Sequence, residues 1–196
     1  MRAAILAAAI AIAAIGACGL RVVVEGRRAL AAGDAAAADG RLADAIAGWE
    51  TAARWYLPFA PHVGEAYARL VELAGKDHHS ALAAWRAVRS AALATRGLWQ
   101  PHRDDLAAAN AQIAELASRD PEGALAGGAN AEARKQFHLE RLGRDPGPAR
   151  GGVFLAVLGI AAWLAGIGVA LRGLVKPGAA VAALGTIGWV IGLAIA

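Results

Sequence analysis

Residues 151–196 read GGVFLAVLGIAAWLAGIGVALRGLVKPGAAVAALGTIGWVIGLAIA. Within them, 151–171 and 177–196 carry no charged side chain, and the only charges are Arg172 and Lys176 in the short link between them. An α-helix rises 1.5 Å per residue, so about 20 apolar residues cross the roughly 30 Å hydrocarbon core of a bilayer. The stretch 151–196 therefore predicts a transmembrane helical hairpin with a tight, basic turn.

The two apolar segments of this hairpin share a motif. LGIAAWLAG at 158–166 matches LGTIGWVIG at 184–192. Small residues four positions apart permit close helix contact. No Asp, Glu, His or Lys lies inside either segment, which argues against a self-contained ion transporter. We expect the helices to pack on each other, or on helices of a homo- or hetero-oligomeric partner, through Gly159, Ala162, Gly166, Gly185, Gly188 and Gly192.

A second apolar region covers Ala3 to Leu20, with an arginine at either side. The chain stays apolar through Val24, which favours a transmembrane signal anchor over residues 1–25. Two alternatives remain open. Residues 1–17 could be a cleaved signal peptide, or Cys18, which follows a lipobox-like Ile-Gly-Ala, could carry a lipid.

The orientation in the membrane depends on which charges are counted. Counting every Arg and Lys beside the spans favours a cytoplasmic middle region. The arginine before the first apolar run and the basic hairpin turn favour the opposite side, because long loops translocate largely regardless of charge. We prefer the second interpretation: an integral protein of a bacterial inner membrane whose middle domain is exported.

The composition sets limits on partners and chemistry. The chain is 58% hydrophobic with a mean hydropathy of +0.43, and its net charge of +4 is scattered along the sequence. Nucleic-acid binding would need a basic stripe, so we expect no nucleic-acid partner. The single cysteine excludes an internal disulfide and a cysteine-rich zinc site.

Residues 26–142 predict an all-α domain. Apolar residues recur every three or four positions, and no alternating strand pattern is present. The stripes run over 42–56, 63–74, 81–92, 106–116 and, more weakly, 131–142. The breaker cluster GRDPGPAR at 143–150 predicts a short linker before the hairpin.

An internal repeat lies within this domain. AIAGWETA at 45–52 aligns with ALAAWRAV at 81–88. The order of small, aromatic and small residues resembles the second helix of a tetratricopeptide repeat, and Gly33 and Gly40 match that family's small residue and turn glycine. The resemblance implies two helical hairpins, roughly 26–58 and 63–96, that bind a protein through a concave groove. An unrelated alanine-rich bundle would carry the same pattern.

Two loops follow the aligned helices: RWYLPFAPH at 54–62 and TRGLWQPH at 95–102. Trp, Tyr and Arg are the side chains that most often anchor interfaces. The competing interpretation is that these aromatics only close the core at the hairpin ends. As candidates for binding a protein partner we name Arg54, Trp55, Tyr56, Phe59, His62, Arg96, Trp99 and His102.

No reactive constellation stands out. The five histidines lack the spacing of a helical zinc site, and no nucleophile–base set or phosphate-binding glycine motif is recognisable. We therefore expect no catalytic, metal or cofactor-binding residues. The sequence favours a non-enzymatic adaptor that contacts membrane lipid and a protein partner in an envelope complex. The alternative is an accessory subunit of a channel, motor or transporter that acts through its transmembrane helices.

Overall fold

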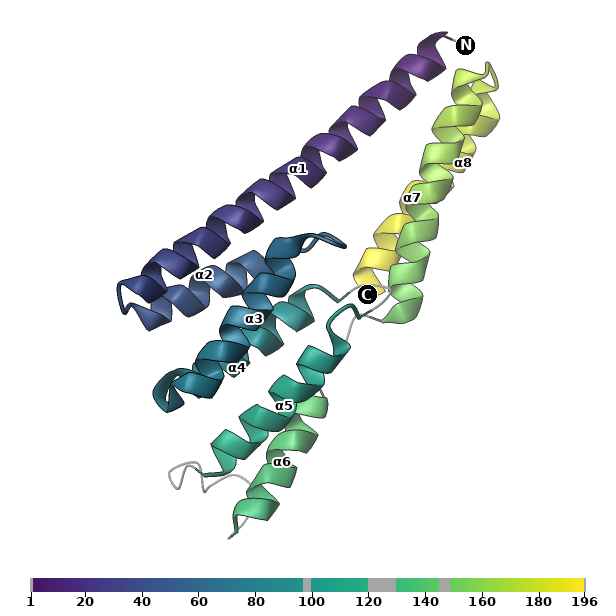
Figure 1. The fold of residues 1–196 in the computed structure, drawn as a ribbon. Coiled ribbons are helices and arrows are strands. Elements are labelled where there is room, and N and C mark those ends of the chain that lie inside the picture. The colour runs from purple at the N-terminus through teal and green to yellow at the C-terminus, as the bar shows by residue number, and fades with distance from the viewer. Residues whose placement is uncertain (1, 97–99, 120–129, 145–148, 196) are drawn as a thin grey trace. The chain divides into compact units, whose positions relative to one another are not determined.

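The computed structural model describes residues 2–96, 100–119, 130–144 and 149–195 (Figure 1). These residues contain helices and no strand, so the all-α prediction is confirmed. They belong to two compact units, one with α7, α8 and the part of α1 before Cys18, the other with α1 from Cys18 onward and α2 to α6. The helices are α1 (Arg2–Ala38), α2 (Leu42–Arg54), α3 (Pro61–Lys76), α4 (His78–Ala94), α5 (Arg103–Ser118), α6 (Ala131–Gly143), α7 (Arg150–Leu171) and α8 (Val175–Ile195).

Helix α1 runs without interruption across the boundary expected between an anchor and the middle domain. Packing on the rest of its unit begins at Gly26, where an added Cβ would lie 2.2 Å from Nε2 of His62 on α3. Before that point the side chains of Ile15 and Leu20 are 73% and 66% exposed. The side chains of residues 1–12, on which much of the predicted N-terminal anchor rests, lie outside the described part of the chain.

Helices α1 and α2 form a hairpin with an unusually close crossing. Gly40 turns the chain with φ +74°, a conformation that glycine adopts without steric cost. A Cβ added to Gly48 would lie 2.7 Å from the Cα of Gly33, so two backbones touch where both glycines sit. Beside them, Nε1 of Trp49 donates to Oδ1 of Asp34 at 2.9 Å.

The next two hairpins follow in order, α3 with α4 and α5 with α6 (Figure 1). Asp77 caps α4 by accepting from the backbone N–H groups of His79 and Ser80, and Asn130 caps α6 through the N–H of Ala133 at 2.8 Å. Helix α6 buries no side chain fully. The core of this unit is rich in small residues, which let the helices approach closely: Ala45, Ala52, Ala53, Ala66, Ala84, Ala87, Ala91 and Ala109, with Leu30, Trp49, Val63, Tyr67, Leu70 and Val88 between them.

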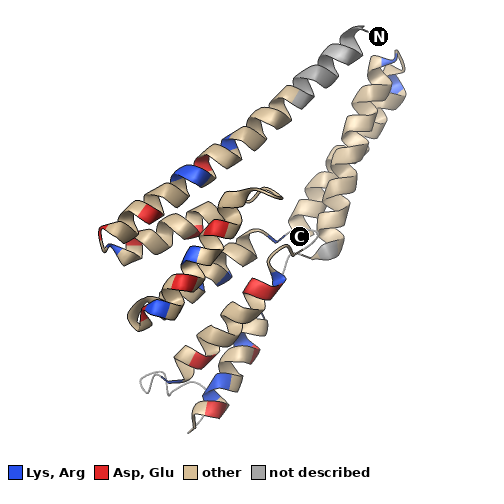
Figure 2. Ribbon diagram, in the orientation of Figure 1, with Lys and Arg blue, Asp and Glu red and all other residues tan. Residues whose placement is uncertain are grey.

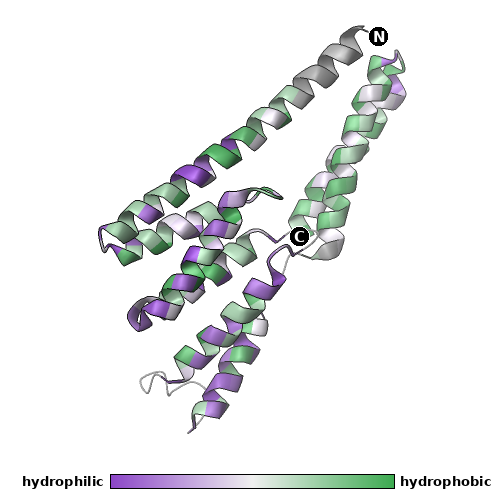
Figure 3. Cartoon of the chain, in the orientation of Figure 1, coloured by the Kyte–Doolittle hydropathy of each residue, from purple (hydrophilic) through white to green (hydrophobic). Residues whose placement is uncertain are grey.

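Helices α7 and α8 form a hairpin in the other unit. Both helices are long and apolar enough to cross a membrane, by length and composition. Between 151 and 195 the only charges are Arg172 and Lys176 near the turn (Figure 2), and both helices are hydrophobic along their length (Figure 3). Helix α8 begins at Val175, two residues before the start we expected, because Pro177 fits the first turn, where its missing N–H would have no helical partner.

Glycines form the seam of this hairpin. A Cβ on Gly159 would lie 2.2 Å from the backbone N of Trp189, and one on Gly166 would lie 2.4 Å from that of Ala182. Gly185 and Gly192 face the opposite backbone in the same way, at 2.4 Å and 2.3 Å from its nearest nitrogen. Of the six small residues that we expected at the packing face, these four are buried in the seam, whereas Ala162 and Gly188 are half-buried. The seam also contains Gly152 and Gly178, which the comparison of motifs did not single out.

Candidate functional site

Parts of the two predicted binding loops meet around one histidine. The ring of His102 stacks on Tyr67 of α3 with 4.2 Å between centroids, and its edge faces Tyr56 at 5.8 Å. Nδ1 of His102 lies 3.0 Å from a carboxylate oxygen of Asp105, one turn into α5. The loops at 54–62 and 95–102 are therefore joined through a half-buried aromatic cluster.

His62 belongs to the core and not to this surface. It is 1% exposed, and its Nε2 lies 2.8 Å from the carbonyl oxygen of Trp55. That carbonyl can only accept, so Nε2 carries the proton in this pairing. The absence of a side chain at Gly26 leaves the space that the imidazole fills. His62 thus fixes the start of α3 against α1 and the end of α2.

The other predicted binding residues lie in different environments. Phe59 is fully exposed, at 103%, and is the one non-glycine residue with positive φ (+68°) in the described chain. Arg54 pairs with Glu50 one turn earlier on α2 and donates to Oγ of Ser90 on α4 at 2.6 Å. Trp55 and Arg96 are half-buried. Trp99 lies outside the described residues.

Tyr67 is buried within the cluster, which predicts a measurable pH dependence. Burial, and secondarily the negative charge of Asp105, raises the pKa of the Tyr67 phenol above its ordinary value of 10.0. A raised pKa contributes stability that is complete below the ordinary value and is lost as the pH rises above it. We expect Tyr67→Phe to flatten the loss of thermal stability of the full chain in detergent above about pH 10. Circular dichroism melts from neutral to alkaline pH test this, with Tyr56→Phe as the control that keeps the alkaline loss. An equal alkaline loss in both variants would contradict the assignment.

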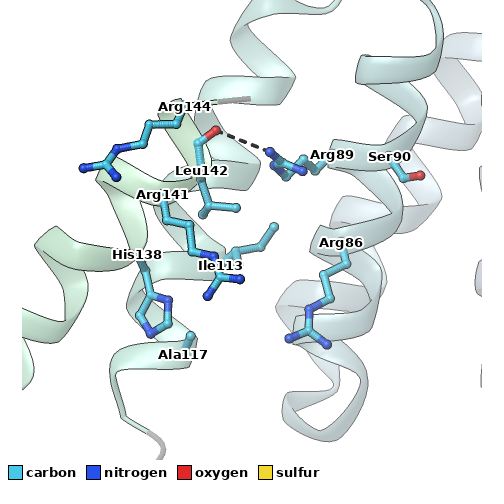
Figure 4. Close-up of a pocket in the computed structure, with 9 residues that line it drawn as sticks. All are labelled: Arg86, Arg89, Ser90, Ile113, Ala117, His138, Arg141, Leu142 and Arg144. Atoms are coloured by element: carbon cyan, nitrogen blue, oxygen red, sulfur yellow. Dashed lines mark hydrogen bonds between the residues drawn. The ribbon is translucent and has the colours of Figure 1, made fainter. Parts of the chain in front are cut away.

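A second candidate site escaped the sequence reasoning: a cavity of about 680 Å³ between α4, α5 and α6 (Figure 4). Among the described residues, four arginines and a histidine line it, and no carboxylate does. The arginines come in pairs three positions apart: Arg86 with Arg89 on α4, and Arg141 on α6 with Arg144, the C-cap residue of that helix. That spacing puts each pair on one helix face and is the only signal that the sequence offers. The remaining lining residues are Ser90, Ile113, Ala117, His138 and Leu142.

One arginine holds the walls of this cavity together. Nε of Arg89 donates to Oδ1 of Asn110 on α5 at 2.9 Å, and its Nη2 donates to the carbonyl oxygen of Leu142 on α6 at 3.3 Å. Arg89 therefore fixes the end of α6 against α4 and α5. The dashed line in Figure 4 marks the bond to Leu142.

The described part of the chain contains no candidate metal site. No group of three or more His, Cys, Asp or Glu side chains is arranged there to hold an ion. The described geometry offers two binding features in the helical unit: the loop between α2 and α3, which contains the exposed Phe59, and the arginine cavity. Neither a known protein family, nor a curated protein, nor a solved structure matches this chain.

Proposed function

We propose that this chain is a membrane-anchored adaptor that binds a protein partner and catalyses no reaction. The α7–α8 hairpin is its transmembrane anchor, helped by the apolar first part of α1. The hairpins from Gly26 to residue 142 form a tetratricopeptide-like array on the exported side of a bacterial inner membrane. The adaptor serves as one subunit of an envelope complex.

The surface of the α7–α8 hairpin supports the membrane part of the proposal. Glycines occupy the seam, so the large side chains of both helices point outward, and Phe154, Leu164, Leu184 and Val190 are all exposed. Helices that are apolar on every side are either buried in a large core or placed in lipid. Lipid tails would cover this surface without leaving any polar group unpaired in the hydrocarbon.

Phe59 is the observation that carries the partner-binding part. A phenyl ring that is fully exposed leaves a large apolar area in water. It also stands on a backbone with positive φ, which bulky residues rarely adopt. Such strain is often found at ligand-binding and switch sites. Both costs are offset if the ring enters a pocket on another protein, next to the half-buried Trp55.

One observation supports the alternative, an accessory subunit that works through its transmembrane helices. A cavity of about 450 Å³ on the hairpin is lined by Ile160, Trp163, Thr186 and Trp189. The two tryptophans occupy equivalent places in the repeated motif. A helix of a neighbouring membrane protein would fill this hollow by side-chain packing.

A photo-crosslinking experiment tests the adaptor. A benzophenone amino acid replaces Phe59 in the full-length membrane protein, and a matched chain carries it at Gln112, an exposed position on α5. We expect one discrete protein product at position 59 and none at 112. Phe59→Ala should lower co-purification of that same protein by about tenfold, the effect of losing an interface anchor.

The outcome for thermal stability separates binding from folding. Because Phe59 makes little contact with its own chain, Phe59→Ala should leave the melting temperature unchanged. Crosslinks of equal yield at both positions, or full recovery of the partner by Phe59→Ala, would refute the proposed binding surface. A partner that is recovered by the variant but lost when Trp163 and Trp189 become alanine would favour the alternative.

A further inference from the structure

The lining of the cavity between α4, α5 and α6 concentrates positive charge. The described residues of its lining include four guanidinium groups and no carboxylate. Like charges that share a concave site repel each other, and the walls of the cavity reduce screening by solvent. The fold therefore carries an electrostatic cost at this place unless an anion occupies it.

Among the described residues, two carboxylates near the cavity, on α5 and α6, already have cationic partners. Glu140 pairs with Arg144 at 3.6 Å, and Arg144 extends away from α4 (Figure 4). Glu115 of α5 pairs with Arg119 and Lys135, each at 2.9 Å.

The other two arginines of the lining are Arg86 and Arg141. Within the described residues neither of them has a hydrogen bond or ion pair. They reach toward the cavity from opposite walls, α4 and α6 (Figure 4).

One neutral side chain, His138, adds to the lining. The hydroxyl of Ser90 points away from the other lining side chains (Figure 4) and accepts a hydrogen bond from Nη2 of Arg54 at 2.6 Å. Nε2 of His138 is buried and has no hydrogen-bond partner in the described structure. A buried polar atom of this kind is normally satisfied by water, an ion or a ligand. The cavity therefore combines guanidinium and imidazole groups around one space.

The chemistry of these donors selects among anions. Guanidinium groups bind phosphate and carboxylate through paired N–H bonds. A carboxylate offers two oxygens, whereas a phosphate group offers three or four and can accept from both walls at once. A volume of about 680 Å³ also falls in the range of small-molecule sites. The arrangement thus fits a phosphate-bearing ligand better than a single carboxylate.

We propose that this cavity is a binding site for a phosphate group, with Arg86 and Arg141 as its direct ligands and Arg89 as the residue that positions α6. The phosphate can belong to an anionic lipid headgroup or to a soluble compound. Six positions separate Arg144 from Arg150, and a chain of that length spans at most about 21 Å. A lipid headgroup is therefore within reach if α7 crosses the membrane. The site does not depend on the protein partner bound at Phe59.

The test uses the full-length chain in lipid nanodiscs. In the first arm the discs contain only phosphatidylcholine, and inorganic pyrophosphate is titrated by calorimetry. In the second arm the discs contain photoactivatable phosphatidic acid, and labelled peptides are mapped by mass spectrometry. Each arm compares the native chain with Arg86→Gln, Arg141→Gln and Arg103→Gln. Arg103 is an exposed arginine of α5 outside the cavity, so its variant loses the same charge without touching the site.

If the cavity binds the phosphate group, only the variants of its lining should lose binding. Arg86→Gln and Arg141→Gln should weaken binding about tenfold or more, because each removes charge-assisted hydrogen bonds to the ligand, and Arg103→Gln should not. If the cavity variants lose only pyrophosphate binding, the ligand is a soluble phosphate compound. If they lose only the photo-labelling of α4 and α6, the ligand is a lipid headgroup. Equal effects of all three variants, or no binding in either arm, overturn the proposal. Phe59→Ala should bind like the native chain, so a failure of the adaptor surface is distinguishable from a failure of this site.

Discussion

Gly166→Leu is expected to separate α7 from α8. At this position a Cβ alone would lie 2.4 Å from the backbone nitrogen of Ala182 and 2.7 Å from the carbonyl oxygen of Gly178. Overpacking against movable side chains costs about 1–3 kcal/mol, and here the obstacle is backbone, which cannot rotate away. The helices must therefore move apart along the whole glycine seam. Since 1.4 kcal/mol is a factor of ten in an equilibrium constant, the closed hairpin should become at least about tenfold less populated.

Disulfide trapping measures this opening. In a Cys18→Ser background, cysteines replace Leu155 and Gly188, where a Cβ on Gly188 would lie 3.9 Å from Cδ1 of Leu155. Oxidation in washed membranes should cross-link the native hairpin efficiently and the Gly166→Leu hairpin about tenfold less.

Gly168→Leu is the matched control, because nothing lies within 4 Å of a Cβ there. It adds the same side chain to the same helix and should leave the yield unchanged. Equal yields in both variants would contradict the seam. Release of the native chain from membranes by alkaline carbonate would contradict the membrane anchor itself.

The seam also shows how far the sequence predicts this structure. The absence of charge over 151–171 and 177–196 was enough to predict two helices and their basic turn. The facing residues were harder, because a search for small residues four apart included Gly188 and missed Gly152 and Gly178. A period of seven was the better guide: Gly152, Gly159 and Gly166 on α7, and Gly178, Gly185 and Gly192 on α8. Such a period keeps one stripe facing a partner in a left-handed helix pair.

In the helical unit, local sequence patterns predicted the helices. The candidate sites depend on contacts between residues that are distant in sequence. Stripes of apolar residues predicted α2 to α6 because helix periodicity is a local property. His62 looked like a loop residue beside aromatics, and only its position against Gly26 reveals that it is buried. The arginine cavity joins Arg86 to Arg141, which are far apart in the chain. No pattern within either segment predicts that α4 and α6 line the same cavity. The site is therefore apparent only from how the helices pack.

The second large effect is expected at the crossing of α1 and α2. A Cβ on Gly48 would lie 2.7 Å from the Cα and 2.8 Å from the nitrogen of Gly33, and 3.2 Å from the carbonyl oxygen of Ala29. Alanine in place of a helix-interior glycine gains about 1 kcal/mol in helix propensity. Forcing two backbones apart costs about 3 kcal/mol or more, the upper end of overpacking. The cost exceeds the gain, so Gly48→Ala should destabilise the hairpin array by about 2 kcal/mol.

A substitution of the same type elsewhere should have the opposite sign. Gly64 lies in α3 with nothing within 4 Å of an added Cβ, so Gly64→Ala keeps the propensity gain without the clash. In thermal unfolding of the full chain in detergent, followed by circular dichroism, Gly48→Ala should melt about 8 °C below the native chain and Gly64→Ala about 4 °C above it, at roughly 4 °C per kcal/mol. The two variants differ only in what the methyl group meets, because both replace a helical glycine by alanine. Shifts of the same sign would mean that α1 and α2 do not cross at Gly33, and the packing of the first hairpin would have to be redrawn.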